Sequence, residues 1–259
     1  MRLDLFLFEN GFSESRQRAK LLINSECVKV NGKVITKPAY DTLEGDTVEV
    51  VGDPIGYVSR GALKLKAAFE EFNLTASNLV CVDIGASTGG FTDFLLKNGA
   101  KKVYAIDSGT NQLAETLRND IRVISKEKYN ARNLMLSDFD DKIDMAVMDV
   151  SFISQTLIIP ALYNILDDNS LFVSLIKPQF EAGREAIGKG GIVKNPASRA
   201  FAIKKVVDCA KTVGFKLCGL TVSPILGGDG NTEYLALFSK GESAYQTIDN
   251  IDNIIMRYL

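Results

Sequence analysis

The sequence of 259 residues contains no histidine. Histidine is the side chain most often used as a general base near neutral pH, and it is also the commonest zinc ligand. Acid–base chemistry in this chain therefore has to use lysine, aspartate, glutamate, tyrosine or cysteine. The four cysteines form no C-x-x-C pair, and three of them lie in apolar runs where a thiol behaves as a small hydrophobe. We therefore expect neither disulfides nor a metal site.

Long apolar runs are also missing. No uninterrupted apolar stretch approaches the ~20 residues that a membrane-spanning helix requires. The N-terminal stretch "MRLDLFLFENGF" contains Asp4 and Glu9 and has no small-residue cleavage site, so it does not resemble a signal peptide. A hydrophobic content of 46% and a charged content of 24% are typical of a soluble globular protein. We expect a cytoplasmic protein of one large or two unequal domains, with no membrane segment.

Residues 1–53 contain short elements of their own. The apolar residues among the first eight positions predict a helix that ends at Gly11, and Ser13 is the expected N-cap of a second helix through "ESRQRAKLLIN". Asn31 and Gly32 stand between the two alternating runs of "VKVNGKVIT", which is a strong hairpin signal. A further strand is predicted at "GDTVEVV". This part of the chain should form a small α+β domain.

Basic residues gather in this first part of the chain. The segment from Arg16 to Lys37 has six basic residues and one acidic residue, although the whole chain has a net charge of −2. Such a cluster is either a solvated surface or a face that lies along a phosphate backbone, where each neutralised phosphate releases counterions.

The same region resembles a known RNA-binding module. The runs "RLD", "SRQRAKLLI", "VKVNG", "KPAY" and "EGDTVEV" are similar to the α-L motif of a small-subunit ribosomal protein and of many RNA-modifying enzymes. The resemblance implies that the second helix and the hairpin contact structured RNA. The residues predicted to bind RNA are Arg16, Arg18, Lys20, Lys29 and Lys33, with Arg60 farther along the chain.

The rest of the chain alternates apolar strands with helical segments. The strand-like runs are "LVCVDI", "KVYAID", "RVIS", "IDMAVMDV", "SLFVSLIK", "KLCGLTVS" and "EYLALFSK". This alternation predicts a mostly parallel, doubly wound α/β sheet, on which ligands bind beyond the carboxyl ends of the strands. We expect the RNA-binding domain at 1–53, a linker at 54–60 and a Rossmann-like domain with a seven-stranded sheet at 61–259.

The stretch "VCVDIGASTGGFTDFL" reads as a buried strand, a glycine-rich turn and a helix. Phe91 occupies the lysine position of the phosphate-binding pattern G-x-x-x-x-G-K-[ST], and the glycine spacing differs from the dinucleotide pattern G-x-G-x-x-G. Asp83 opens the turn, and Asp107 ends the next strand, where a ribose diol is bound in doubly wound folds. These acids suit a ligand with a ribose and a cationic end, such as S-adenosylmethionine. The alternative is that both carboxylates only cap helix N-termini.

The residues predicted to bind this cofactor lie in the turn and after the following strands. They are Asp83, Gly85, Ser87, Gly89, Gly90, Phe91, Asp107, Asn130 and Asp149.

Four ionisable residues stand near strand ends or at the entry to the second domain: Lys64, Asp149, Lys177 and Glu233. They are either solvated strand ends or groups that converge over the cofactor. Base N-methyltransferases of this fold usually carry [DN]-P-P-[YF] after the fourth strand, whereas this chain has "MDVSF" there, without the prolines.

Several runs in this region resemble the FtsJ-like ribose 2′-O-methyltransferases: "YVSRGALKL", "DIGASTGGFTD", "MDVSFIS", "LIKPQFEAGRE", "GKGGIVK" and "GNTEYL". The whole chain is similar to the TlyA family of ribosomal RNA methyltransferases, sometimes called haemolysin-like. The resemblance implies methylation of a cytidine 2′-hydroxyl in ribosomal RNA, with the large-subunit RNA favoured over the small-subunit RNA. It also implies that the four ionisable residues act on this hydroxyl, which a neutral Lys177 would deprotonate.

One run departs from the family pattern. Family members in which the interdomain linker is recognised as a motif carry Arg-x-Trp-Val before "SRG". This chain has "IGYVSRG" instead, without the arginine and the tryptophan. Coupling through the linker between RNA binding and cofactor binding is therefore not implied here.

Other classes of protein make different demands on the sequence. A pseudouridine synthase needs a G-x-L-D-x-x-T context, which this chain lacks. A pore-forming haemolysin needs a membrane element, and the longest candidate, "LIIPALYNIL", is short and contains Pro160. A non-catalytic RNA-binding protein would bind ribosomal RNA without binding S-adenosylmethionine. We expect a monomer whose partner is ribosomal RNA or a ribosomal subunit.

Overall fold

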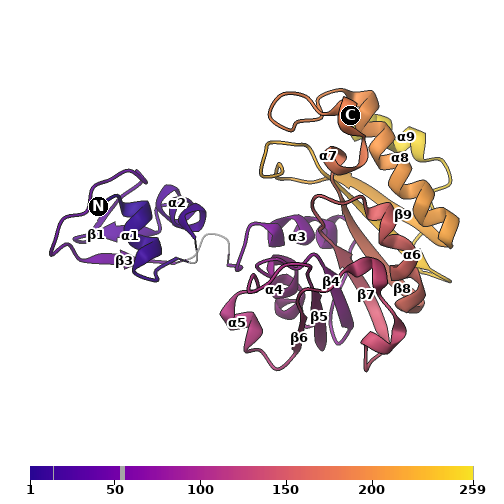
Figure 1. Ribbon diagram of the computed structural model, residues 1–259, viewed down its shortest axis with the longest axis horizontal. Helices are drawn as coiled ribbons and strands as arrows, with labels where there is room; N and C mark the ends of the chain where they lie inside the picture. The colour runs from indigo at the N-terminus through magenta and orange to yellow at the C-terminus, as the bar shows by residue number, and fades with distance from the viewer. Residues whose placement is uncertain (14, 53–55, 259) are drawn as a thin grey trace. The chain divides into compact units, whose positions relative to one another are not determined.

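The computed structural model describes residues 1–13, 15–52 and 56–258. The chain divides into two compact units, Met1–Ser59 and Arg60–Leu259 (Figure 1). The predicted linker at 54–60 lies partly outside the described residues.

The first unit is a small α+β domain. Helices α1 (Leu3–Glu9) and α2 (Arg16–Asn24) accompany a three-stranded antiparallel sheet in the order β2-β1-β3. Its strands are β1 (Val28–Val30), β2 (Lys33–Val34) and β3 (Val48–Val50). The core consists of apolar residues from both helices and β1: Leu3, Leu7, Ala19, Leu22, Ile23, Val28 and Val30.

Two local predictions for this unit have different outcomes. The hairpin is confirmed, because Asn31 and Gly32 have φ angles of 51° and 76° and join β1 to β2, as a two-residue turn with both central φ angles positive requires. The N-cap prediction is wrong. Ser15, in the extended conformation directly before α2, accepts a hydrogen bond from Arg18 N at 3.1 Å, whereas Ser13 Oγ donates to Ser15 O.

The second unit is built on a seven-stranded sheet in the order β6-β5-β4-β7-β8-β10-β9. Its strands are β4 (Val80–Ile84), β5 (Lys102–Ile106), β6 (Val123–Lys126), β7 (Ile143–Met148), β8 (Leu166–Ile176), β9 (Phe215–Val222) and β10 (Tyr234–Lys240). Neighbouring strands are parallel from β6 to β8, and β10 is antiparallel to both of its neighbours. The predicted mostly parallel seven-stranded fold is confirmed.

Helices cover this sheet. Packing contacts join α3 (Gly61–Glu71) to α4 (Gly90–Lys97) and to β10, and join α6 (Ile159–Ile165), α8 (Pro196–Val213) and α9 (Ile251–Tyr258) around β8 and β9 (Figure 1). The shorter helices are α5 (Glu115–Arg118), α7 (Pro178–Glu181), η1 (Ala131–Asn133), η2 (Leu136–Asp138), η3 (Gln155–Leu157) and η4 (Arg184–Ala186).

The parallel strands bring four loops to one edge of the sheet. Ile84 pairs with both Ile106 and Met148, so the residues that follow β4, β5 and β7 lie at a similar height. Met148 in turn pairs with Ser174 near the end of β8. The residues that begin the four loops are Gly85, Asp107, Asp149 and Lys177.

Candidate active site

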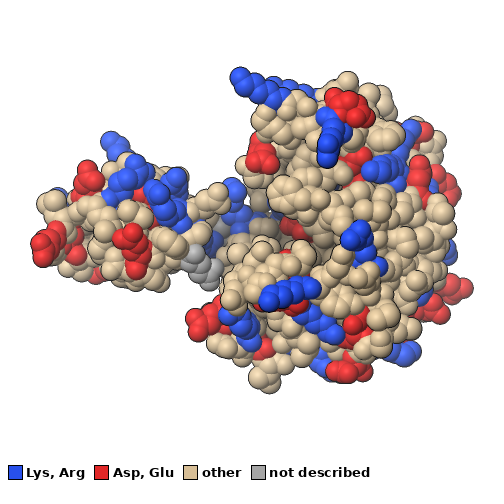
Figure 2. All heavy atoms as spheres, viewed as in Figure 1, with Lys and Arg blue, Asp and Glu red and all other residues tan. Residues whose placement is uncertain are grey.

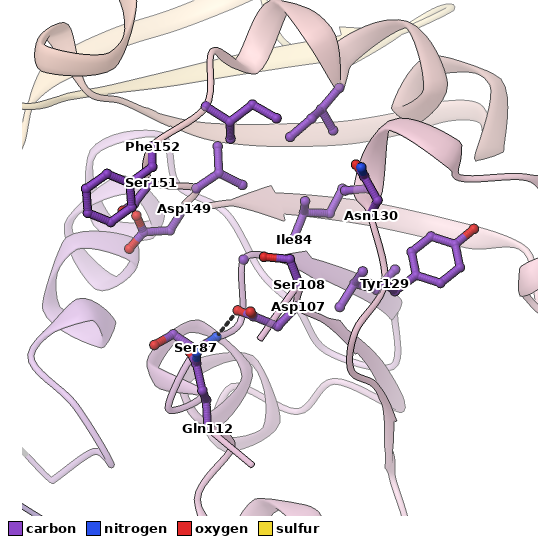
Figure 3. Close-up of a pocket in the computed structure, with 16 residues that line it drawn as sticks. Ile84, Ser87, Asp107, Ser108, Gln112, Tyr129, Asn130, Asp149, Ser151 and Phe152 are labelled. Atoms are coloured by element: carbon purple, nitrogen blue, oxygen red, sulfur yellow. Dashed lines mark hydrogen bonds between the residues drawn. The ribbon is translucent and has the colours of Figure 1, made fainter. Parts of the chain in front are cut away.

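A cavity of about 350 Å³ opens at this edge of the sheet. Its walls combine the apolar side chains of Ile84, Ile106 and Ile158 with carboxylates from Asp107 and Asp149. Figure 3 shows Asp149, Ser151 and Phe152 on one side of the cavity and Tyr129 and Asn130 on the other, with Asp107 between them. The volume lies within the range of about 300–1,000 Å³ that is usual for small-molecule sites.

Asp107 is held in place by two backbone groups. Its Oδ2 accepts a hydrogen bond from Ser87 N at 2.8 Å (Figure 3). Its Oδ1 accepts one from Gly109 N at 2.7 Å. Each carboxylate oxygen has two acceptor positions, so each keeps one for a ligand hydroxyl. The bonds tie the loop after β5 to the glycine-rich turn, and neither goes to a helix N-terminus.

Asp83 lies behind the cavity rather than in its wall. Its side chain is fully buried and accepts hydrogen bonds from the hydroxyl group of Thr92, at 2.7 Å, and from the backbone N–H of Thr92, in the first turn of α4. Asp83 therefore fits the alternative in which a carboxylate only caps the N-terminus of a helix. Its Oδ1 has no hydrogen-bond partner among the described residues, and burial raises the pKa of this carboxyl to about 7.

The glycines of the turn have packing roles. A Cβ on Gly85 would lie 2.5 Å from the backbone oxygen of Asp149, so only glycine permits this approach of the turn to the end of β7. Gly89 has a φ of 94°, and a Cβ there would lie 2.3 Å from Leu117 Cδ1.

The predicted cofactor residues therefore form two groups. Those that line the cavity are Gly85, Ser87, Asp107, Asn130 and Asp149. The others are buried in the protein and do not line the cavity: Asp83, Gly89, Gly90 and Phe91. Gly89 is the N-cap of α4 and Gly90 is its first residue.

The four predicted catalytic residues form two ion pairs. Lys64 Nζ lies 2.6 Å from Glu233 Oε2, and Lys177 Nζ lies 2.6 Å from Asp149 Oδ1. The side chains of Lys64, Lys177 and Glu233 are only 11%, 10% and 2% exposed, so they are not solvated strand ends. Buried charges of this kind require a partner, because removing a lone charge from water is costly.

Lys177 has a second partner in the same loop as Asp149. Its Nζ donates a hydrogen bond to Ser151 Oγ at 2.8 Å, whereas the contact with Asp149 is an ion pair without hydrogen-bond alignment. Asp149 and Ser151 both line the cavity, so the Lys177 amine is held beside it.

The second pair is held by the last strand. Glu233 directly precedes β10, and Gln179 Nε2 donates to its Oε1 at 3.4 Å. A Cβ on Gly227 would lie 2.5 Å from the same oxygen, so a glycine loop passes directly over this carboxylate. Lys64 reaches Glu233 from α3.

Ser151 and Phe152 line the cavity but were not predicted as site residues. They occur in the "MDVSF" run, from which only Asp149 was assigned a role. Phe152 is 93% exposed, has a φ of 62° and packs against Phe180 with ring centroids 5.2 Å apart. Exposure of a large aromatic residue could not be read from its position in the sequence.

In the first unit, Asp4 organises two arginines. Its buried carboxylate contacts Arg2 Nε and an Arg16 guanidinium nitrogen, each at 2.9 Å, and hydrogen bonding to Arg2 is the main cause that lowers the pKa of Asp4 to about 2. Arg16 is 47% exposed despite this contact, and Arg2 is a further cation that was not predicted from the sequence.

The other predicted RNA contacts differ in exposure. Lys20 and Lys33 are exposed, and Arg18 and Lys29 are half-buried. Arg60 is exposed at the start of α3 in the second unit. Figure 2 shows Lys and Arg side chains gathered over α2 on the face in view.

The described residues form neither a metal-ligand cluster nor a membrane-spanning helix. Within residues 1–13, 15–52 and 56–258, no group of three or more His, Cys, Asp or Glu side chains could hold a metal ion. No helix in the described part of the chain is both long and apolar enough to cross a bilayer.

Comparison with known families identifies both units. Residues 57–240 match the family model of the FtsJ-like methyltransferases, and residues 1–48 match that of the S4 domain. The chain belongs to the FtsJ-like methyltransferase family. The S4 match agrees with the RNA-binding module that the N-terminal runs resemble.

Individual relatives match almost the full length. Hemolysin A of Brachyspira hyodysenteriae is 49% identical over 92% of this chain and 99% of its own. The 16S/23S rRNA (cytidine-2′-O)-methyltransferase TlyA of Mycobacterium tuberculosis is 41% identical over 90% of this chain and 87% of its own. The solved structure of a protein from Streptococcus thermophilus named as a hemolysin superposes with a TM-score of 0.77 at 43% identity, covering 99% of this chain and 94% of that one. The resemblance to the TlyA family is confirmed.

Proposed function

We propose that this chain transfers a methyl group from S-adenosylmethionine to the ribose 2′-hydroxyl of a cytidine in ribosomal RNA. The observation that supports this reaction most strongly is the ion pair between the buried Lys177 and Asp149, whose carboxylate lines the cavity at the sheet edge. A lysine amine next to a small-molecule cavity provides a proton acceptor in a chain that has no histidine.

The cavity fits S-adenosylmethionine. Asp107 has free acceptor positions for the two hydroxyls of a ribose, and the Asp149 carboxylate provides a negative wall for a cationic group. Apolar walls from Ile84, Ile106 and Ile158 suit an adenine ring. A polyphosphate is disfavoured, because the same carboxylates would repel it. When bound there, S-adenosylmethionine would supply an electrophilic methyl group on its sulfonium.

The residues around the cavity have separate tasks in this proposal. Lys177, in its neutral form, takes the proton of the ribose hydroxyl as the oxygen becomes a nucleophile. Asp149 and Ser151 fix the position of the amine through contacts at 2.6 and 2.8 Å. Glu233 holds the second amine of the set, that of Lys64, through a contact at 2.6 Å. Placing the hydroxyl in line with the methyl group contributes as much to the rate of methyl transfer as proton removal by Lys177 does.

Two features support RNA as the substrate. The S4 domain carries exposed cations over α2, and the exposed ring of Phe152 at the rim of the cavity offers a surface on which an unstacked base can lie. The choice of a cytidine in ribosomal RNA follows the name of the Mycobacterium tuberculosis relative, which specifies both 16S and 23S rRNA. For this chain we favour the large-subunit RNA.

The proposal is tested by incubating the purified chain with S-adenosylmethionine and ribosomal subunits. A 2′-O-methyl group blocks alkaline cleavage of the next phosphodiester bond, so a methylated site should appear as one missing band in a hydrolysis ladder. A base-methylated product, or RNA binding without methyl transfer and without a heat of S-adenosylmethionine binding, would reject the proposal.

A further inference from the structure

The segment that follows β7 carries three residues of the site in an unusual conformation. Asp149, Ser151 and Phe152 line the cavity, and Phe152 has a φ of 62°. A bulky residue keeps this left-handed conformation only when its surroundings hold it there. The side chain of Phe152 is 93% exposed, so its own burial does not hold it. The restraint must come from neighbouring residues.

Glu181 supplies this restraint from the far end of α7. Its Oε2 accepts a hydrogen bond from Ser154 Oγ at 2.5 Å, and its Oε1 accepts one from Gln155 N at 2.7 Å. The side chain of Glu181 is 1% exposed, and Lys205 from α8 places its Nζ 3.3 Å from Oε2 and donates to the backbone oxygen of Glu181. A buried carboxylate with three partners fixes the segment two residues beyond Phe152.

The side chain of Gln155 ties the same segment to β8. Its Nε2 donates to Leu175 O at 2.6 Å, and its Oε1 accepts from Ser174 Oγ. Leu175 and Ser174 precede Lys177 by two and three residues, and Glu181 follows it by four. Lys177 therefore lies between two points at which its own segment is tied to the segment of Asp149.

We propose that Glu181 is a positioning residue for methyl transfer. By holding Ser154 and Gln155 against α7, it keeps Asp149 and Ser151 in contact with Lys177. Glu181 touches neither the cavity nor Lys177 directly, because it is absent from the cavity wall and its bonds go to other residues. The kinetic part of this proposal rests on the function proposed above.

The kinetic test compares Glu181→Ala with Glu181→Gln. We expect Glu181→Ala to lower kcat at least ~10-fold, because small displacements of reacting groups carry such losses, while S-adenosylmethionine affinity and RNA affinity stay within ~3-fold. Glu181→Gln keeps an acceptor for Gln155 N and should stay within ~3-fold of the wild-type kcat. Glu185→Ala is the matched control, because Glu185 is an exposed carboxylate four residues further on. Equal losses in Glu181→Ala and Glu185→Ala would overturn the proposal.

A second test does not depend on activity. The chain has no tryptophan, so Phe152→Trp introduces a single tryptophan on the restrained segment, and its fluorescence can be excited selectively over that of the tyrosines. In this background Glu181→Ala should lower the fluorescence anisotropy of the probe, and Glu185→Ala should leave it unchanged. Unchanged anisotropy in Glu181→Ala would show that Glu181 does not hold the segment.

Two outcomes are separated by this design. If Glu181→Ala does not fold, Ser154→Ala takes its place, since it removes one bond to Glu181 without leaving a buried charge unpaired, and it should lower both kcat and anisotropy. If the wild-type chain transfers no methyl group to RNA, the proposed function fails, and the anisotropy comparison still decides whether Glu181 restrains the segment.

Discussion

Asp149 takes part in two features of the site: its carboxylate lines the cavity at the edge of the sheet, and its Oδ1 lies 2.6 Å from Lys177 Nζ. In the proposed reaction, this relationship places an amine where the substrate hydroxyl would meet the methyl donor. The fold provides it, because β7 and β8 are parallel neighbours and end at the same edge of the sheet.

Lys177 is expected to be essential as a base and not only as a positive charge. Lys177→Arg keeps the charge but stays protonated, and Lys177→Ala removes the amine. Both variants should lose methyl transfer by at least ~100-fold while cofactor affinity stays within ~3-fold. Steady-state kinetics and calorimetry measure the two quantities. Lys142→Arg is the control, since Lys142 is 80% exposed in a pair with Asp167. An arginine variant with near-normal turnover would leave Lys177 a positioning role only.

Asp107 is expected to dominate recognition of the cofactor ribose. Asp107→Ala should weaken S-adenosylmethionine binding by roughly 2–4 kcal/mol, through the loss of two hydrogen bonds to the ligand and of the bonds from Ser87 N and Gly109 N. Isothermal titration calorimetry provides the measurement, with the exposed Glu115 on α5 replaced by alanine as a control. Unchanged affinity in Asp107→Ala would remove the ribose assignment.

Asp83 should make the stability of the protein depend on pH. Burial raises its pKa from 3.8 to about 7, so the folded state binds a proton more tightly than the unfolded chain between these values. This carboxyl therefore lowers the free energy of unfolding as pH rises from about 4 to about 7, by about 4 kcal/mol at most.

Denaturant titrations at several pH values test this dependence. The stability of Asp83→Asn relative to wild type should increase from pH 4 to pH 8, because the variant lacks the titrating group. Asp168→Asn should show no such increase, because Asp168 is 85% exposed. Parallel stability curves for wild type and Asp83→Asn would show that Asp83 does not titrate in this range.

The exposed cations of the S4 domain are expected to supply RNA affinity without affecting cofactor binding. Lys20→Glu combined with Lys33→Glu should weaken binding to ribosomal RNA and reduce the slope of log K against log salt by about 0.7–0.9 for each phosphate that the protein no longer neutralises. Lys142→Glu in the second unit is the matched charge reversal. Identical affinity and slope in the S4 double variant and wild type would identify these lysines as a solvated surface.

The elements of the fold were largely predictable from local sequence. Helix α8 is an example, because residue types that favour helix ends stand at both of its ends: Asn195 is its N-cap, Pro196 is its first residue and Gly214 is its C-cap. Helix α9 was missed, although Ile251 and Ile255 pack into the core, because eight residues give little periodicity.

The partners in the site were less predictable. Lys64 and Glu233 are separated by 169 positions, and they meet because α3 packs against β10, which lies between β8 and β9 and so out of chain order in the sheet. No pattern of neighbouring residues encodes that order. The position of Asp83 was unpredictable for the same reason. Its place behind the cavity and its bonds to Thr92 follow from how α4 packs on β4.

The most direct test of the central claim is nucleoside mass spectrometry of ribosomal RNA from cells that lack this protein, complemented with the wild-type chain or with Lys177→Ala. We predict that 2′-O-methylcytidine at a discrete ribosomal RNA position is absent without the protein, is restored by the wild-type chain and is not restored by Lys177→Ala. Full restoration by Lys177→Ala, or an unchanged level of 2′-O-methylcytidine in cells that lack the protein, would contradict the account.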